Sequence, residues 1–430
     1  MLGKFLIVGF INIKNQIKKG YIACDETTGI ITNFGLHDDD YIKKFKGKKF
    51  IYGYNYVIEA GDFNAHSHPE QSIYCDIVDK DWDLPTWCRN TIYKYSPILK
   101  PQHIYLACCR AFSRMLMLGV TTVMVSFYCH NNKGNVNDDE VIKAARDTGI
   151  RLYFGRMNYD IINYESYDAK INSQSGYFET ASEAENNFLR LMNEKNYDNV
   201  IIAPAIHSIH ASSREAIVNA INLGNKYNKY IQLHLSEDMG DVDLSLKLYN
   251  KRPVEFLVSL LLSGEVQTLE NMILSDCVWI DDNERRLIKE YNIKVVLNPR
   301  MNARIKAGEA DLEKLIVIGI NPYLGTDGEA SNYDLSIVNE KEFLKKRFSN
   351  VSEVLFDKVG KQALRFGDAW VGDIEIGNYC DLKITKNGYI GYSDVFVGGK
   401  RVVECGKLLT LDVDNYIERE LRKIIEKDLI

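Results

Sequence analysis

The middle of the chain alternates between short apolar runs rich in β-branched residues and longer segments with apolar residues at helical spacing. Eight of the short runs are predicted strands, at residues 57–64, 120–127, 151–155, 200–206, 230–235, 272–277, 294–298 and 322–325. Eight alternating β/α units predict an α/β fold, a (β/α)₈ TIM barrel with parallel strands. A doubly wound open sheet is the alternative. It is disfavoured because neither a GxGxxG turn nor a Walker loop follows the first strand.

The two ends of the chain have a different pattern. Short β-type runs occur at 4–11, 20–24, 30–34 and 49–54, and again at 381–384, 393–397 and 400–403 around Gly-rich turns. We therefore expect residues 1–57 and 371–430 to form one small β-sandwich domain, and residues 58–370 to form the barrel. Ile and Leu at helical spacing within 414–429 predict a surface helix at the end of the chain.

Composition narrows the class of protein. The 430 residues carry 53 Lys and Arg against 59 Asp and Glu, a net charge of -6 that gives no general attraction for nucleic acid or an anionic membrane. No apolar run is long enough to span a membrane, and the first residues lack a signal-peptide cleavage site. The nine Cys form no CxxC pair, so we expect neither a disulfide framework nor a Cys-based zinc site. These features predict a reduced, cytoplasmic protein with a small-molecule substrate.

Polar residues stand at the ends of three predicted strands, where a barrel carries its chemistry. His66 and His68 end the first strand, and residues two apart on a strand face the same way. His234 ends the fifth strand with Glu237 three residues later, and Asp327 follows the eighth. Three imidazoles and one carboxylate suit a single divalent ion, with Zn²⁺ preferred and Fe²⁺ or Mn²⁺ as alternatives. Glu237 would then handle protons beside the ion.

Each of these signals is weak by itself. The His-x-His pair is as easily chance as a ligand pair, Glu237 could cap the next helix, and the sequence around Asp327 is often only a turn. Their coincidence at three strand ends of one independently counted barrel favours the metal site.

Longer strings around these residues resemble the amidohydrolase superfamily, in its deaminase and chlorohydrolase branch. They are GDFNAHSHP at 61–69, HLSE at 234–237 and LGTDGEASN at 324–332, together with 298–308 and 397–403. The resemblance covers nearly the whole chain. It implies a barrel with a β-sandwich from both termini, a metal-dependent hydrolase acting on a non-peptide C–N bond, and, by analogy with the family, a homodimer.

A closer likeness is to formimidoylglutamate deiminases, and it implies five substrate contacts. Gln71 follows the second metal His by three residues, Arg89 matches a carboxylate-binding Arg, and Tyr128 matches a strand-end Tyr. His207 fits the Pro-His-Ser-x-Arg element, but His210 stands where that element has its Arg. Loss of a fixed bidentate cation leaves the glutamate-like substrate open. Read without the resemblance, Tyr128 is a core aromatic and Arg89 a surface cation.

Two further residues bear on the chemistry. Arg156 ends the third predicted strand and is a candidate second anion contact. Asp276 stands where the family has a His at the end of strand six, and no His follows His234 in the chain. An ionised Asp accepts a hydrogen bond from water but cannot donate one. Crowding with Asp327 and Glu237 is expected to raise the pKa of one of the carboxyls or to attract a second cation.

The expected reaction is hydrolysis of an amidine-like or heteroaromatic C–N bond that releases ammonia. Glu237 shuttles the proton, and Asp276 either orients the water or favours a cationic substrate. A purine-type deaminase, with an adenosine- or guanine-like substrate, is one alternative. The other is a catalytically weak, amidohydrolase-like binding protein, since Asp276 replaces the expected His.

Overall fold

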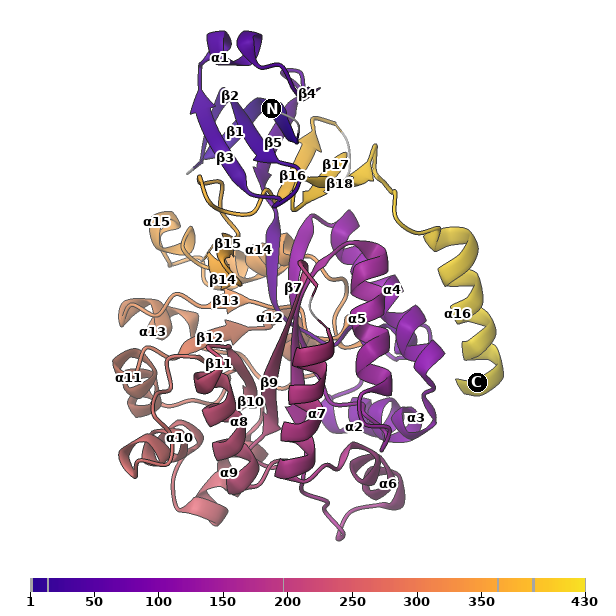
Figure 1. Cartoon of the computed structure of the whole chain (residues 1–430). Coiled ribbons are helices and arrows are strands. Elements are labelled where there is room, and N and C mark those ends of the chain that lie inside the picture. The colour runs from indigo at the N-terminus through magenta and orange to yellow at the C-terminus, as the bar shows by residue number, and fades with distance from the viewer. Residues whose placement is uncertain (1–2, 14, 196, 362, 389–390, 430) are drawn as a thin grey trace.

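The structure, a computed structural model, describes residues 3–13, 15–195, 197–361, 363–388 and 391–429. Its central element is an eight-stranded parallel sheet in which consecutive strands are neighbours (Figure 1). The strands are β6 (Asp62–Ser67), β7 (Val120–Phe127), β8 (Arg151–Asn158), β9 (Val200–Ser208), β10 (Ile231–Leu235), β11 (Met272–Asp276), β12 (Lys294–Leu297) and β13 (Tyr323–Leu324). All eight predicted strands are present, and the sheet is the predicted barrel rather than an open doubly wound sheet.

The two edge strands of this sheet meet. The backbone N–H groups of Thr326 and Asp327, directly after β13, both donate to the carbonyl of His66 in β6, at 3.1 Å. Apolar side chains from alternate strand positions fill the interior, among them Phe63, Met124 and Tyr153. The barrel is therefore a packed core, and chemistry is left to the strand ends.

Helices cover the outside of the barrel. These are α4 (Pro101–Met117), α5 (Val136–Thr148), α7 (Ala181–Glu194), α8 (Arg214–Lys226), α10 (Pro253–Leu262), α11 (Asp282–Glu290), α13 (Leu312–Val317) and α14 (Ile337–Arg347). The residue types at the helix N-termini explain where these helices begin. At α7, for example, Thr180 and Glu183 form a capping box, which satisfies backbone N–H groups in the first turn.

A second group of helices lies at the end of the barrel away from the terminal sheet (Figure 1). These are α2 (Leu84–Asn90), α3 (Ile92–Tyr95), α6 (Asp168–Tyr177) and α9 (Met239–Tyr249), and the short α12 (Pro299–Arg304) follows β12. They belong to the connections that follow the carboxyl ends of the strands. These connections build the walls of the candidate site.

Both ends of the chain join in one further sheet, in the order β19-β18-β17-β16-β5-β1-β2-β3, with β4 paired to β1. Its strands are β1 (Lys4–Ile13), β2 (Gln16–Asp25), β3 (Ile31–Leu36), β4 (Lys48–Ile51), β5 (Tyr56–Ala60), β16 (Leu382–Lys386), β17 (Asp394–Val397), β18 (Lys400–Glu404) and β19 (Lys407–Leu408). Helix α1 (Asp39–Lys44) joins β3 to β4. Side chains from both halves share one apolar core, as the predicted sandwich requires.

Two expectations about this region need correction. The predicted strand 57–64 is two strands: β5 belongs to the terminal sheet and β6 to the barrel, and Gly61 lies between them. The expectation of fully reduced cysteines also differs from the structure, because Cys24 and Cys380 form a disulfide across a separation of 356 residues. Both cysteines lie in the buried core that the two ends of the chain share. Spacing along the sequence could not show that they meet.

The C-terminal tail is helical, as predicted, and it packs on the barrel through α4 (Figure 1). Helix α16 (Glu418–Ile424) buries Leu421, and the turns on either side of it bury Ile417 and Ile425. Glu418 accepts hydrogen bonds from Arg110 and Arg114 of α4. Among the described residues, no helix has the length and apolar character needed to cross a membrane.

Candidate active site

Four predicted ligands converge at the carboxyl ends of the strands. His66 is in β6 and His68 directly follows it, His234 is in β10, and Asp327 follows β13. The His68 and His234 Nε2 atoms are 3.1 Å apart, and the His234 and His66 Nε2 atoms 3.2 Å. Asp327 Oδ1 is 3.3 Å from Nε2 of both His66 and His68. All four ligand atoms lie within 4.8 Å of one another.

The hydrogen bonds behind the imidazoles decide which ring nitrogens face the centre. His68 Nδ1 donates to the Ser126 carbonyl at 2.6 Å, and His234 Nδ1 donates to the His207 carbonyl at 2.7 Å. His66 Nδ1 lies 3.2 Å from Gln232 Oε1. With their protons on Nδ1, the three rings direct Nε2 lone pairs at one point, as metal-ligating His residues do.

The donor set fits a divalent ion. Metal–ligand bonds of about 2.0–2.1 Å give a tetrahedron with edges of about 3.3 Å, close to the spacing of these atoms. The carboxyl of Asp327 is ionised: burial raises its pKa, but His68, His66 and the Ser331 hydroxyl together hold the pKa well below the usual range. Three imidazoles that present Nε2 and one carboxylate oxygen are ligands that several divalent metals accept.

Two further carboxyl groups lie near this cluster. Glu237 follows the bend at Ser236, which has a φ of 53°, and its backbone N–H donates to Asp241 Oδ2 at 3.2 Å. Burial first, and then the charges of Asp276 and Asp327, raise the pKa of the Glu237 carboxyl well above its ordinary value. Burial likewise raises the pKa of Asp276, at the end of β11, to about 6. Glu237 therefore has the proton affinity that an acid–base group needs.

A cavity of about 850 Å³ opens beside the cluster, and its walls come from the connections after β6, β7, β8, β9 and β10. His68, His234, Asp327 and Glu237 line it. All five predicted substrate contacts line it as well: Gln71, Arg89, Tyr128, His207 and His210. Asp276 is not among the described residues that line this cavity. The cavity thus provides, beside the metal cluster, a space large enough for a small organic molecule.

Two of the predicted contacts touch ligands of the cluster directly. The Tyr128 ring contacts His68, with ring centres 5.6 Å apart, and its hydroxyl accepts a hydrogen bond from Gln71 Nε2 at 3.4 Å. The His207 ring lies 5.2 Å from His234. Arg89 is exposed, with its guanidinium 4.7 Å from the centre of the Tyr167 ring. The substrate roles of these residues stay predictions, although their common location agrees with such roles.

Comparison with known proteins identifies the family. A model of the amidohydrolase family matches residues 57–402, which include the barrel and the strands β16 and β17 of the terminal sheet. The chain belongs to the amidohydrolase family. It is a hydrolase that acts on C–N bonds other than peptide bonds, and the family together with the four clustered side chains supports a divalent metal ion as its cofactor.

Individual relatives of this amidohydrolase are similar over nearly their full length. A 5'-deoxyadenosine deaminase from Methanobrevibacter smithii is 24% identical, covering 98% of this chain and 96% of its own. A 5-methylthioadenosine/S-adenosylhomocysteine deaminase from Pyrococcus furiosus is 26% identical, covering 95% and 100%. The similarity to formimidoylglutamate deiminases in particular stays a prediction.

Solved structures share the fold. An adenosine deaminase from Xanthomonas campestris with bound zinc has a TM-score of 0.78 at 20% identity, covering 98% of both chains. An atrazine chlorohydrolase from Arthrobacter aurescens complexed with zinc has a TM-score of 0.79 at 17% identity, covering 98% of this chain and 100% of its own. The barrel with a terminal sheet is therefore common to enzymes of different names.

The amidohydrolase cavity also contains residues that the sequence did not point to. Tyr93, Tyr159, Tyr177 and Lys170 line it. Tyr93, Tyr177 and Lys170 lie on helices α3 and α6 in connections after strands, where no strand-end pattern singles them out. The high frequency of Tyr in these connections is the one sequence feature that could have indicated the three Tyr residues.

The proposed anion contact at Arg156 is wrong. Its guanidinium is buried and pairs with Glu179 through both terminal nitrogens, and its Nε lies 3.1 Å from Asp138 Oδ1. A guanidinium already neutralised by two carboxylates is not available to a substrate anion. Arg156 instead fastens the end of β8 to α5.

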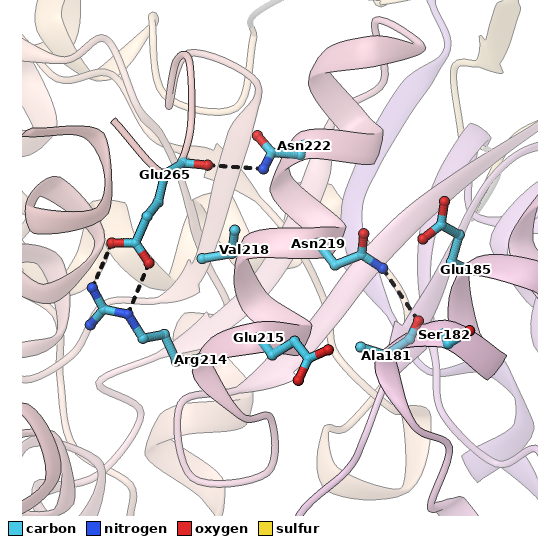
Figure 2. Close-up of a pocket in the computed structure, with 9 residues that line it drawn as sticks. All are labelled: Ala181, Ser182, Glu185, Arg214, Glu215, Val218, Asn219, Asn222 and Glu265. Carbon is cyan, nitrogen blue, oxygen red and sulfur yellow. Dashed lines mark hydrogen bonds and ion pairs between the residues drawn. The ribbon is translucent and has the colours of Figure 1, made fainter. Parts of the chain in front are cut away.

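A second cavity, of about 490 Å³, lies on the outer wall of the barrel near α7 and α8 (Figure 2). Arg214 at its edge is paired with Glu265, and the Asn222 side chain donates to the Glu265 carbonyl. Asn219 donates to the carbonyl of Ala181. These polar groups satisfy one another, so this depression contributes nothing to the chemistry.

Proposed function

We propose that this amidohydrolase is a deaminase that hydrolyses an amidine-like or heteroaromatic C–N bond and releases ammonia. One observation carries the proposal. The four ligand atoms of His66, His68, His234 and Asp327 lie within 4.8 Å, and Glu237 lines the same cavity. A metal ion can activate a water molecule, and a nearby carboxyl of raised pKa can then deliver a proton to the leaving group.

Zn²⁺ is the proposed ion, with Fe²⁺ and Mn²⁺ as alternatives, because three imidazoles and a carboxylate suit all three. When bound, such an ion lowers the pKa of a coordinated water from about 15.7 toward about 7 and so supplies the nucleophile. The Nδ1 hydrogen bonds of His66, His68 and His234 hold the three ligand rings in place before the ion arrives.

Glu237 is the proposed proton shuttle. It takes a proton from the attacking water and gives it to the nitrogen that leaves, while the carbon gains an oxygen and loses the nitrogen. The raised pKa of its carboxyl suits a group that must hold a proton and then release it. Asp276 is the proposed second catalytic carboxyl, which orients the water.

The cavity favours a planar, aromatic substrate of the purine type over a flexible amino acid. His207 lies edge-on to Tyr128 and Tyr159, with ring centres 4.9 and 4.8 Å away. Burial first, and then the neighbouring His234 and His210, hold the pKa of His207 well below its usual value, so its imidazole is neutral. A neutral imidazole among aromatic rings suits an uncharged heterocycle. The names of the relatives agree with this choice.

At the far end of the cavity, His210 and Arg89 are proposed contacts for the rest of the substrate. His210 donates to Asp241 at 2.7 Å, which fixes its ring, and Gln71 is held against Tyr128. The oligomeric state proposed from the family, a homodimer, does not enter this chemistry.

The test is a substrate panel with the metal-loaded protein. It includes 5'-deoxyadenosine, 5-methylthioadenosine, S-adenosylhomocysteine, guanine and simple formimino and guanidino compounds, and ammonia is measured. We expect release from an adenine nucleoside. If no compound releases ammonia while the metal is bound, the proposed deaminase activity is wrong.

A binding protein of low activity is the second candidate, because Asp276 stands where the family has a His. Asp276→His separates the two. If this substitution creates ammonia release that the natural chain lacks, the natural chain is the binding protein. If it lowers an existing activity, the deaminase stands.

A further inference from the structure

The backbone at the end of β11 is bent at Asp276. Asp276 has a φ of 76° and Cys277 a φ of 48°, both in the left-handed region that residues other than Gly rarely adopt. The Cys277 N–H donates to the Ser275 carbonyl at 3.1 Å, two residues back, and also to the Leu235 carbonyl at 3.0 Å. A turn closed by an i to i+2 bond with positive φ is uncommon and strained. Such strain is kept where it aims a functional side chain.

Two amide side chains hold one oxygen of the Asp276 carboxyl. Oδ1 accepts from Asn298 Nδ2 at 2.9 Å and from Asn302 Nδ2 at 3.2 Å. Asn298 also donates to the Ser275 hydroxyl at 2.9 Å, which fixes its own amide group. Asn298 precedes α12 and Asn302 lies on it, and both are buried. The Asp276 side chain is therefore restrained at its backbone and at one oxygen.

The other oxygen is free. Asp276 Oδ2 is buried and has no hydrogen-bond partner among the residues that the structure describes. A buried carboxylate oxygen without a partner is costly, so such an atom marks a place that another molecule completes. Asp276 does not line the open cavity, and the charges of His66 and Asp327 act on its carboxyl, so this carboxyl lies close to the metal ligands.

We propose that Asn302 and Asn298 are positioning residues, which hold Asp276 so that its free oxygen accepts a hydrogen bond from the attacking water. This inference rests on the proposed function and deepens it. A His at this place could donate as well as accept, whereas the Asp only accepts while ionised. The two amides fix which oxygen is presented and prevent the carboxyl from turning toward Glu237.

A double-mutant cycle tests the proposal, with Asn302→Leu, Asp276→Ala and the double variant. The first readout is kcat and KM for ammonia release from 5'-deoxyadenosine or another compound that the panel finds. The second is the visible absorption spectrum of the protein loaded with Co²⁺ in place of zinc, which needs no substrate. Asn137→Ala is the matched control, since Asn137 is a buried amide that donates to the Cys129 carbonyl.

We expect Asn302→Leu to lower kcat by about tenfold or more, with KM changed much less, and to alter the Co²⁺ spectrum. Both effects should vanish when Asp276 is already Ala, and the control should behave as wild type. Equal effects of Asn302→Leu in both backgrounds, or a folded variant with wild-type kcat and spectrum, would overturn the proposal.

Two complications have defined readouts. If Asn302→Leu does not fold, Asn302→Ser takes its place in the cycle with the same expectations. If no compound releases ammonia, the proposed function fails, and the spectral cycle alone decides the positioning role. A spectrum that responds to Asn302 only through Asp276 supports it, and a spectrum that does not respond overturns it.

Discussion

The Nε2 atoms of His68 and His234 lie 3.1 Å apart, although neither ring has a proton there to share. Both rings donate through Nδ1, to the carbonyls of Ser126 and His207. Two lone pairs at this distance repel each other unless a cation lies between them or one ring takes up a second proton. The arrangement is stable as a metal site and unfavourable as an empty one.

Removal of the metal should therefore lower thermal stability. A ligand that binds only the folded state adds about 2.7 kcal/mol at a concentration 100 times its Kd. Dialysis against a chelator should lower the Tm, and Zn²⁺ should restore it. His234→Ala should lose the response to Zn²⁺, while His103→Ala, away from the cluster, should keep it. An unchanged Tm in the wild type would contradict the metal site.

Glu237→Gln should lower kcat by about 10²–10⁴-fold, because the amide cannot carry the proton from water to the leaving nitrogen. The metal content measured by mass spectrometry should stay at the wild-type level, since Glu237 is not one of the four clustered ligands. Asp238→Asn, which changes the neighbouring carboxyl at the start of α9, is the control and should retain activity. Full activity of Glu237→Gln would show that Glu237 is not the proton shuttle.

Glu70 should make stability depend on pH. It is buried, its Oε2 has no partner among the described residues, and burial raises the pKa of its carboxyl to about 8. The folded state then holds a proton that the unfolded chain gives up near pH 4.5, so stability falls as pH rises from about 4.5 to 8. The slope is at most about 1.4 kcal/mol per pH unit. Urea unfolding of Glu70→Gln at several pH values should show a shallower fall; an identical profile would mean that Glu70 is ionised in the folded protein.

The disulfide should be visible in a thiol count. Nine Cys are present, Cys24 and Cys380 are paired and seven are free, so denaturation without reductant should expose seven reactive thiols. A bridge that closes so long a loop should stabilise the fold by about 2–4 kcal/mol. A reductant should accordingly lower the Tm of the wild type and not that of Cys24→Ser. Nine reactive thiols would contradict the pairing.

The sequence is informative at the ends of β6, β10 and β13. His66, His68, His234 and Asp327 could be predicted as one cluster because barrel strands direct their ends to the same place. The break between β5 and β6 could not, since the residues on both sides of Gly61 form one continuous β-type run. Alternation of apolar and polar residues with a period of two indicates a strand, but it does not indicate which sheet the strand joins.

Contacts between distant segments were the main source of error. Arg156 reads as a free cation at a strand end, yet Glu179 in the following connection neutralises it. Cys24 meets Cys380 only because the two ends of the chain share a sheet. Asp276 reads as a replacement for the family's His, but its restraint by Asn298 and Asn302 depends on the packing of α12 against the end of β11.

The central claim is that one divalent ion at His66, His68, His234 and Asp327 drives deamination. The most direct measurement is ammonia release by the metal-depleted protein, titrated with Zn²⁺ in the presence of 5'-deoxyadenosine or another active compound from the panel. Activity should rise linearly and level off at one equivalent of Zn²⁺ per chain, and His234→Ala should stay inactive throughout. Equal activity with and without metal, or activity that persists in His234→Ala, would contradict the claim.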